Sequence, residues 1–112
     1  MQLTVVFVSY NTRDLLRNAL RSIFHAQLPP SCSLSVIVVD NNSGDESAAM
    51  VAAEFPAVTL FASPTNLGFT GGNNLALYAL GLQVTPPATS LTVTPHHAAP
   101  DYVLLLNPDT FH

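Results

Sequence analysis

Short continuous apolar runs alternate along the chain with stretches of helical spacing. The continuous runs lie at 3–8, 35–39, 58–62 and from about 101 onward, and each is rich in β-branched or aromatic residues. Runs of this kind are typical of strands that are covered on both faces. Strands of this type alternating with helices predict an α/β fold with a mostly parallel sheet.

The first helix is predicted between the first two strands. Apolar residues keep helical spacing from Leu15 to Phe24, and Pro29 stops the pattern. Asn11 or Thr12 is the expected N-cap. The opposite stripe carries Arg13, Arg17 and Arg21. This stripe indicates either a solvated helix face or a contact to phosphate or a partner.

A second helix is predicted from about Glu46 to Glu54, capped by Ser43 or Asp45 and closed by Pro56.

Residues 63–74 are rich in glycine and asparagine, and helical spacing resumes at Leu75. We therefore expect a loop that leads into a third helix. Residues 83–100 show no clear period and predict a long connection, with a short extended piece at 91–93.

The simplest topology for these elements is an open, Rossmann-like parallel sheet with flanking helices. Right-handed crossovers give the strand order 3-2-1-4. All four strands then end at one edge, which is where ligands bind in open α/β sheets.

Composition excludes several classes of protein. Hydrophobic residues make up 48% of the 112-residue chain, and charged residues make up only 9%. The net charge is −4, and the chain contains no lysine. These values exclude a disordered chain and argue against nucleic-acid binding. A phosphorylated ligand would need a divalent cation. Cys32 is the only cysteine, which excludes an internal disulfide.

The chain has no apolar run long enough to span a membrane and no secretory start, so we expect a cytoplasmic protein. A parent protein at the inner face of the membrane is the alternative location. Its length allows one domain, which is short for an α/β enzyme that holds two substrates. We expect one half of a larger protein.

Polar residues follow each predicted strand, and their expected convergence is the main functional signal. They are Ser9, Tyr10 and Asn11 after the first strand, Asp40, Asn42, Ser43 and Asp45 after the second, Asn66, Gly68, Gly72 and Asn73 after the third, and Asn107 and Asp109 after the last. Such a set offers hydrogen-bond partners for a nucleotide and a carboxylate for a metal ion.

Each signal also has a simpler structural explanation. Asp40 could cap the turn that follows it. Gly71 and Gly72 could be needed only because the backbone has a positive φ or because a helix packs closely there. The segment 107–109 could be an ordinary turn. His96 and His97 lie in the aperiodic connection, and we expect neither to bind metal.

Four motifs in order resemble family 2 glycosyltransferases of the GT-A fold, and within them the bacterial rhamnosyltransferase-like branch. The motifs are Val8-Ser9-Tyr10-Asn11, Val38-Val39-Asp40-Asn41-Asn42-Ser43, Asn66-Leu67-Gly68-Phe69-Thr70-Gly71-Gly72-Asn73-Asn74 and Leu105-Leu106-Asn107-Pro108-Asp109-Thr110.

The resemblance implies a nucleotide-sugar site for a UDP or dTDP donor, with Mg²⁺ or Mn²⁺ on the diphosphate. Asp40 would accept a hydrogen bond from the pyrimidine, and residues 9–11 would lie against base and ribose. Residues 68–73 would shape the donor pocket. Asp109 matches the metal-binding acid of the family, and Asn107 stands in place of its partner acid.

The implied reaction is inverting transfer to an acceptor hydroxyl on a saccharide or glycolipid, in cell-envelope polysaccharide synthesis. None of the acids Asp14, Asp45, Glu46, Glu54 and Asp101 matches the family's catalytic base. We therefore expect this chain to bind donor without turnover, and to self-associate through apolar surface meant for the missing half.

The alternative is a non-catalytic nucleotide-binding or regulatory module, which an in-frame stop after residue 112 would favour. A nicotinamide-binding enzyme is excluded, because no Gly-x-Gly-x-x-Gly turn follows the first strand.

Overall fold

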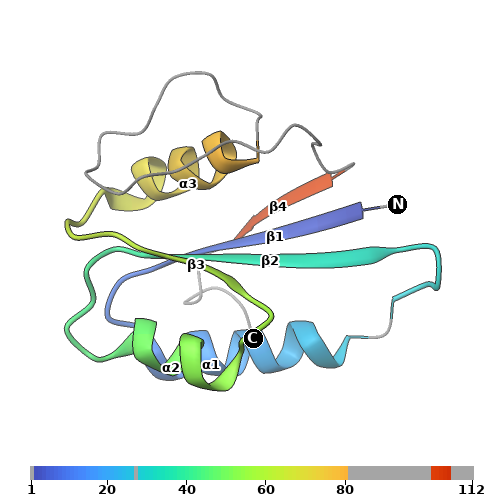
Figure 1. Cartoon of the computed structure of the whole chain (residues 1–112), viewed down its shortest axis with the longest axis horizontal. Helices are drawn as coiled ribbons and strands as arrows, with labels where there is room; N and C mark the ends of the chain where they lie inside the picture. Colours follow the sequence, from blue (N-terminus) through green and yellow to red (C-terminus); the bar gives the residue numbers. More distant parts are fainter. Residues whose placement is uncertain (1, 27, 81–101, 107–112) are drawn as a thin grey trace.

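The computed structural model describes residues 2–26, 28–80 and 102–106. Strands and helices alternate along this part of the chain (Figure 1). In order they are β1 (Gln2–Ser9), α1 (Arg13–His25), β2 (Ser33–Asp40), α2 (Ser47–Glu54), β3 (Thr59–Ala62), α3 (Gly68–Ala79) and β4 (Tyr102–Leu106). All four predicted strands are present, within about two residues of their predicted bounds.

The strands form one parallel sheet in the order β3-β2-β1-β4, as predicted. In β1, Val5 pairs with Val36 of β2 on one side and with Leu104 of β4 on the other. Since every strand runs the same way, the carboxyl ends of β1, β2 and β3 lie along one edge. Ser9 pairs with Asp40, and Asp40 with Ala62, at that edge.

The sheet is covered on both faces, which explains the unbroken apolar runs. Figure 1 shows α1 and α2 on one face and α3 on the other. Val5 and Phe7 of β1 pack with the buried residues of α1 and α2, whereas Val6 and Val8 point to α3. Alternate side chains of one strand thus serve two separate cores.

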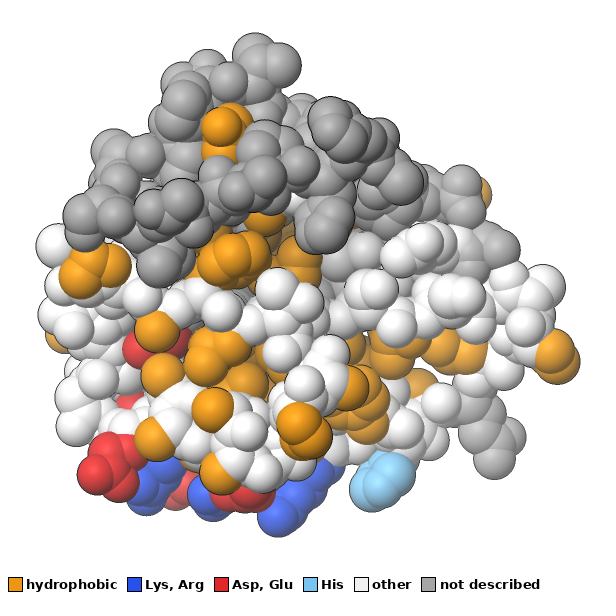
Figure 2. Space-filling view, in the orientation of Figure 1, with side chains coloured by type: hydrophobic (Ala, Val, Ile, Leu, Met, Phe, Trp, Pro, Cys, Tyr) orange, Lys and Arg blue, Asp and Glu red, His pale blue; other side chains and the backbone are white. Residues whose placement is uncertain are grey.

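On the α1 and α2 side, Leu16 and Leu20 of α1 are fully buried. Phe24 of α1 stacks on Phe55, just after α2, with ring centroids 6.0 Å apart. The charged side chains of this layer stay outside, and Figure 2 shows acidic and basic groups gathered along the lower edge of the molecule, over α1 and α2.

The predicted start of the third helix is wrong. α3 begins at Gly68 rather than near Leu75, so the glycine-rich run forms its first turns. A Cβ atom on Gly72 would lie 2.6 Å from Cγ1 of Val8. Close packing against β1 therefore selects glycine here and outweighs its low helix propensity.

Thr12 is the N-cap residue of α1, in agreement with the prediction, but its side chain makes no capping hydrogen bond. The Thr12 hydroxyl lies 2.9 Å from that of Ser9 and caps nothing. The N–H of Arg13, at the start of the helix, instead donates to a carboxylate oxygen of Asp45 over 2.9 Å. The cap thus comes from the loop after β2, far away in sequence.

The predicted connection at 83–100, with its extended piece at 91–93, lies outside the described residues. None of the described helices is long and apolar enough to cross a membrane. At the β4 edge of the described sheet, Tyr102, Leu104 and Leu105 are exposed.

Candidate functional site

A pocket of about 280 Å³ opens at the carboxyl edge of the sheet. It is lined by Val8, Tyr10, Thr12, Asn41, Asn66, Gly68 and Phe69. These residues come from the ends of β1 and β2 and from the start of α3. The pocket therefore lies where the parallel topology predicts a ligand.

Asn41 connects β2 to the wall of this pocket. Its side chain is almost fully buried, at 2% exposure. Its amide nitrogen donates to the carbonyl of Gly68 over 3.0 Å, and its amide oxygen accepts from the N–H of Leu67 over 3.2 Å. Asn41 thereby fixes the backbone that leads into α3.

The Asp40 carboxylate is engaged in its own turn. One oxygen accepts from the Ser43 hydroxyl over 2.6 Å, and the other accepts from the Ser43 N–H over 3.1 Å. Asp40 is buried and does not line the pocket, although its neighbour Asn41 does. The turn-capping explanation of Asp40 thus describes its contacts in the structure.

The loops after β1 and β2 are hydrogen-bonded to each other. The N–H of Asn11 donates to the Ser43 hydroxyl over 2.9 Å, and the N–H of Gly44 donates to the side-chain oxygen of Asn11 over 2.8 Å. Asn11 and Asn42 have positive φ, at 52° and 62°, which asparagine tolerates better than most residues. These loops hold one side of the site in place.

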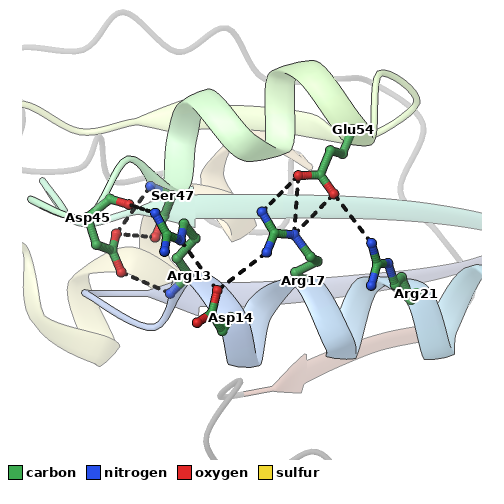
Figure 3. Close-up of polar contacts among 7 residues, drawn as sticks. All are labelled: Arg13, Asp14, Arg17, Arg21, Asp45, Ser47 and Glu54. Atoms are coloured by element: carbon green, nitrogen blue, oxygen red, sulfur yellow. Dashed lines mark hydrogen bonds and ion pairs between the residues drawn. The ribbon is translucent and has the colours of Figure 1, made fainter.

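Asp45 joins the same loops to α1 and α2 (Figure 3). One carboxylate oxygen accepts from the N–H and hydroxyl of Ser47, and the other accepts from the N–H of Arg13. Burial raises the pKa of Asp45, but the hydrogen bonds from Ser47 and Arg13 outweigh it and leave that pKa below its ordinary value. The prediction that Ser43 or Asp45 is the N-cap of α2 is wrong by position, because Glu46 occupies the N-cap, although the Asp45 carboxylate accepts from the N–H of Ser47, the first residue of the helix.

The arginine stripe of α1 makes ion pairs with acids of the same layer. Arg17 donates to both carboxylate oxygens of Glu54, with the shortest bond at 2.9 Å, and Arg21 lies 3.7 Å from Glu54 (Figure 3). Hydrogen bonding to Glu54 raises the pKa of Arg17 further above its already high value. This stripe is therefore an outer face that joins α1 to α2.

Residues 4–81 match the sequence profile of a family described as glycosyl transferase family 2. The chain belongs to glycosyl transferase family 2. This match covers most of the chain and includes the residues that form the pocket. Among curated proteins no match was found.

Solved structures share the fold of this chain. The chain is similar to S. aureus TarS 1-349, with a TM-score of 0.69 and 22% identity. A second structure of S. aureus TarS gives the same TM-score and identity. The match covers 97% of this chain in both cases, but only 28% and 17% of the two TarS chains. The predicted α/β fold with an open parallel sheet is confirmed.

The structure brings together only part of the predicted family 2 site. Tyr10, Asn66 and Gly68 line the pocket. Gly72 and Asn73 are buried in α3 and do not line it. Among the described residues, the side-chain oxygen of Asn73 is one of two buried polar side-chain atoms without a hydrogen-bond partner.

The other predicted site residues lie around the pocket or outside the described part. Ser9 is buried and does not line the pocket, and Asn11, Asn42 and Ser43 belong to the loops after β1 and β2. Asn107 and Asp109 lie outside the described residues. Within the described ranges, no three His, Cys, Asp or Glu side chains are grouped as they would be to hold a metal ion.

Three pocket residues, Val8, Thr12 and Asn41, are not among the predicted site residues, whereas Phe69 lies within residues 68–73, which the family resemblance implies shape the donor pocket. Asn41 lies between two predicted site residues, Asp40 and Asn42, in the motif that follows the second strand. The loop predicted over residues 63–74 includes Phe69. As part of α3, the same residue faces the pocket.

Proposed function

We propose that this family 2 chain is the nucleotide-sugar-binding part of a glycosyltransferase. The donor is a UDP- or dTDP-sugar, and the sugar passes with inversion to a hydroxyl of a saccharide or glycolipid acceptor. We assign the parent protein to cell-envelope polysaccharide synthesis in the cytoplasm. The single observation that carries the proposal is the pocket at the carboxyl edge of the sheet, inside the residues that match the family.

The size and lining of the pocket support a nucleoside rather than a larger ligand. Its volume of about 280 Å³ is at the lower end of ordinary ligand sites. Its lining combines aromatic rings with Thr12, Asn41 and Asn66. In this assignment Tyr10 contacts the base, and the loop from Ser9 to Asn11 contacts base and ribose.

Asp40 has acceptor capacity left for a pyrimidine N–H. Each carboxylate oxygen has two acceptor positions, and Ser43 uses one on each. Asp40 can therefore hold its turn and accept a further hydrogen bond. Asn42 and Ser43 belong to the same assigned nucleotide-binding set.

Asp109 is assigned as the metal-binding acid, with Mg²⁺ or Mn²⁺ as the ion, and Asn107 as a partner for a ribose or sugar hydroxyl. Carboxylate oxygen is a preferred ligand of both ions. With one acid instead of two, the metal would be held more weakly than in a two-acid site.

The test is a calorimetric titration of the 112-residue chain with UDP, dTDP and GDP, with and without Mn²⁺. We expect UDP or dTDP to bind more tightly than GDP, and Mn²⁺ to increase the affinity. Asp109→Asn should remove the effect of Mn²⁺ and leave the metal-free affinity unchanged. Equal binding of all three nucleotides, or of none, would contradict the proposal.

We also propose that the chain binds donor without transferring sugar, because no described acid is placed as a base beside the pocket. The measurement is release of nucleoside diphosphate from UDP- and dTDP-sugars with added acceptor saccharides. Multiple turnovers by the purified chain would overturn this part.

We also propose that the chain self-associates through β4. The five residues of β4 carry no charge and no proline, and three of them are exposed at the edge of the described sheet. Uncharged edge strands pair readily with other strands. We expect a second copy of this chain to pair there, so that Leu104→Lys shifts the chain toward monomer in light scattering. A wild-type chain that stays monomeric at high concentration would disprove this.

A further inference from the structure

Phe69 is an aromatic residue of α3 that lies beyond the end of the sheet. It shares a helical stripe with Gly72, Asn73 and Ala76, all of which are buried against the strands. Phe69 is nonetheless 47% exposed and lines the pocket. Because Gly72 packs on Val8, next to the last residue of β1, a position one turn earlier in α3 projects past that strand.

Tyr10 is the second aromatic residue of the same pocket. It follows β1 directly and is 50% exposed. A single exposed apolar side chain is ordinary and needs no explanation. Two aromatic rings from separate elements in one pocket, beside polar side chains, suit a flat ligand with apolar faces and polar edges.

The backbone that carries Phe69 is held without a ligand. Asn41 bonds to Leu67 and Gly68, and the side-chain oxygen of Asn66 accepts from the N–H of Gly68 over 2.8 Å. Gly68 adopts a φ of 74°, which a side chain would strain. A preset ring position lowers the conformational cost of binding.

We propose that Phe69 is a specificity-determining residue of the nucleotide site, whose ring stacks on one face of the nucleobase while Tyr10 contacts the other. This inference rests on the proposed nucleotide-sugar function and deepens it. Stacking on aromatic side chains is tolerant of base identity. Phe69 therefore selects for a ligand with an aromatic base, and the amide groups of the pocket select among bases.

The chain contains no tryptophan, which allows a direct optical test. Phe69→Trp places a single indole at the proposed stacking position. We expect UDP or dTDP, with Mg²⁺ present throughout, to quench its fluorescence saturably. Inorganic pyrophosphate, which has no base, should leave it unchanged. The matched control is Phe24→Trp on α1, where neither ligand should alter the emission.

Affinity measurements complete the test. Phe69→Ala should weaken UDP binding about tenfold or more, the range expected for loss of one base-stacking ring. Phe69→Leu should weaken UDP binding by a similar factor, since leucine keeps the apolar bulk but has no aromatic face. Phe69→Tyr should bind UDP as tightly as wild type does. Unchanged thermal midpoints of these variants would show that the fold is retained.

Failure of this inference is distinguishable from failure of the proposed function. If wild type binds UDP or dTDP but Phe69→Ala binds equally well and Phe69→Trp is not quenched, the stacking role is wrong and the nucleotide site stands. If wild type binds neither nucleotide, the proposed function and the inference are both overturned.

Discussion

Gly72 of α3 and Val8 of β1 are packed so closely that no side chain fits between them. A Cβ atom on Gly72 would lie 2.6 Å from one methyl group of Val8 and 3.1 Å from the other. Val8 is buried and β-branched, so its side chain has little freedom to move aside. This contact sets how near α3 approaches the sheet and where its first turn meets the pocket.

Gly72→Ala is expected to lower the free energy of unfolding by about 1–3 kcal/mol, the usual effect of overpacking a core. Urea denaturation measures it. In the double variant with Val8→Ala, the loss should be smaller than the sum of the two single losses, because the clash is relieved. Gly44→Ala is the control, since its nearest atom would be 3.9 Å away. A Gly72→Ala chain as stable as wild type would contradict the packing.

Asn41→Ala should cost about 1–3 kcal/mol, because it leaves the Leu67 N–H and the Gly68 carbonyl without their partner. Hydrogen exchange at the Leu67 amide should become faster, and nucleotide affinity should fall with it. For stability and for hydrogen exchange at Leu67, Asn42→Gly is the matched control, since Asn42 is exposed with a positive φ that glycine adopts freely. Nucleotide affinity is compared with wild type alone, because Asn42 belongs to the assigned nucleotide-binding set. Unchanged exchange at Leu67 would show that Asn41 does not fix this segment.

The lowered pKa of Asp45 is expected to make the stability of the fold depend on pH. The pKa of this carboxylate is lowered in the folded state by hydrogen bonds from Ser47 and Arg13, so its ionised form stabilises the fold above the ordinary value of 3.8. That contribution is lost as pH falls through the lowered folded-state pKa. Asp45→Asn should therefore be less stable than wild type at pH 6, with the difference shrinking below about pH 4. Thermal melts from pH 2.5 to 7 measure this, and a pH-independent difference would rule it out.

The ion pair of Arg17 and Glu54 should contribute little, because both side chains are partly exposed. Glu54→Gln is expected to lower the melting temperature by a few degrees at most in low salt. The loss should disappear in 1 M NaCl, where the Debye length is about 3 Å. A loss that persists in high salt would mean that Glu54 acts through packing rather than charge.

The sheet was predictable because its signals are local. Each strand is a short apolar run, and the handedness of crossovers then leaves one simple strand order. The start of α3 was not predictable in the same way. Glycine disfavours a helix locally, and only the contact of Gly72 with Val8 shows why a helix forms there.

The site was predictable as an edge of the sheet but not residue by residue. Asp45 caps a helix that begins more than thirty residues earlier, and Asn41 reaches a backbone segment beyond β3. Such pairings depend on how the sheet brings distant loops together. The sequence therefore indicates Tyr10, Asn66 and the segment with Phe69, all of which line the pocket, but it does not single out Asn41.

The pairing of β1 with β4 has a consequence for how the chain is made. Leu3 of β1 lies beside Tyr102 of β4, so β1 leaves the ribosome well before β4, its neighbour on that side, has been made. Until then β1 has no strand paired to it on the β4 side, although it can already pair with β2. Closing so long a loop is entropically costly and slow. During synthesis, the described sheet therefore depends on β1, β2 and the helices α1 and α2 for its structure until β4 has been made.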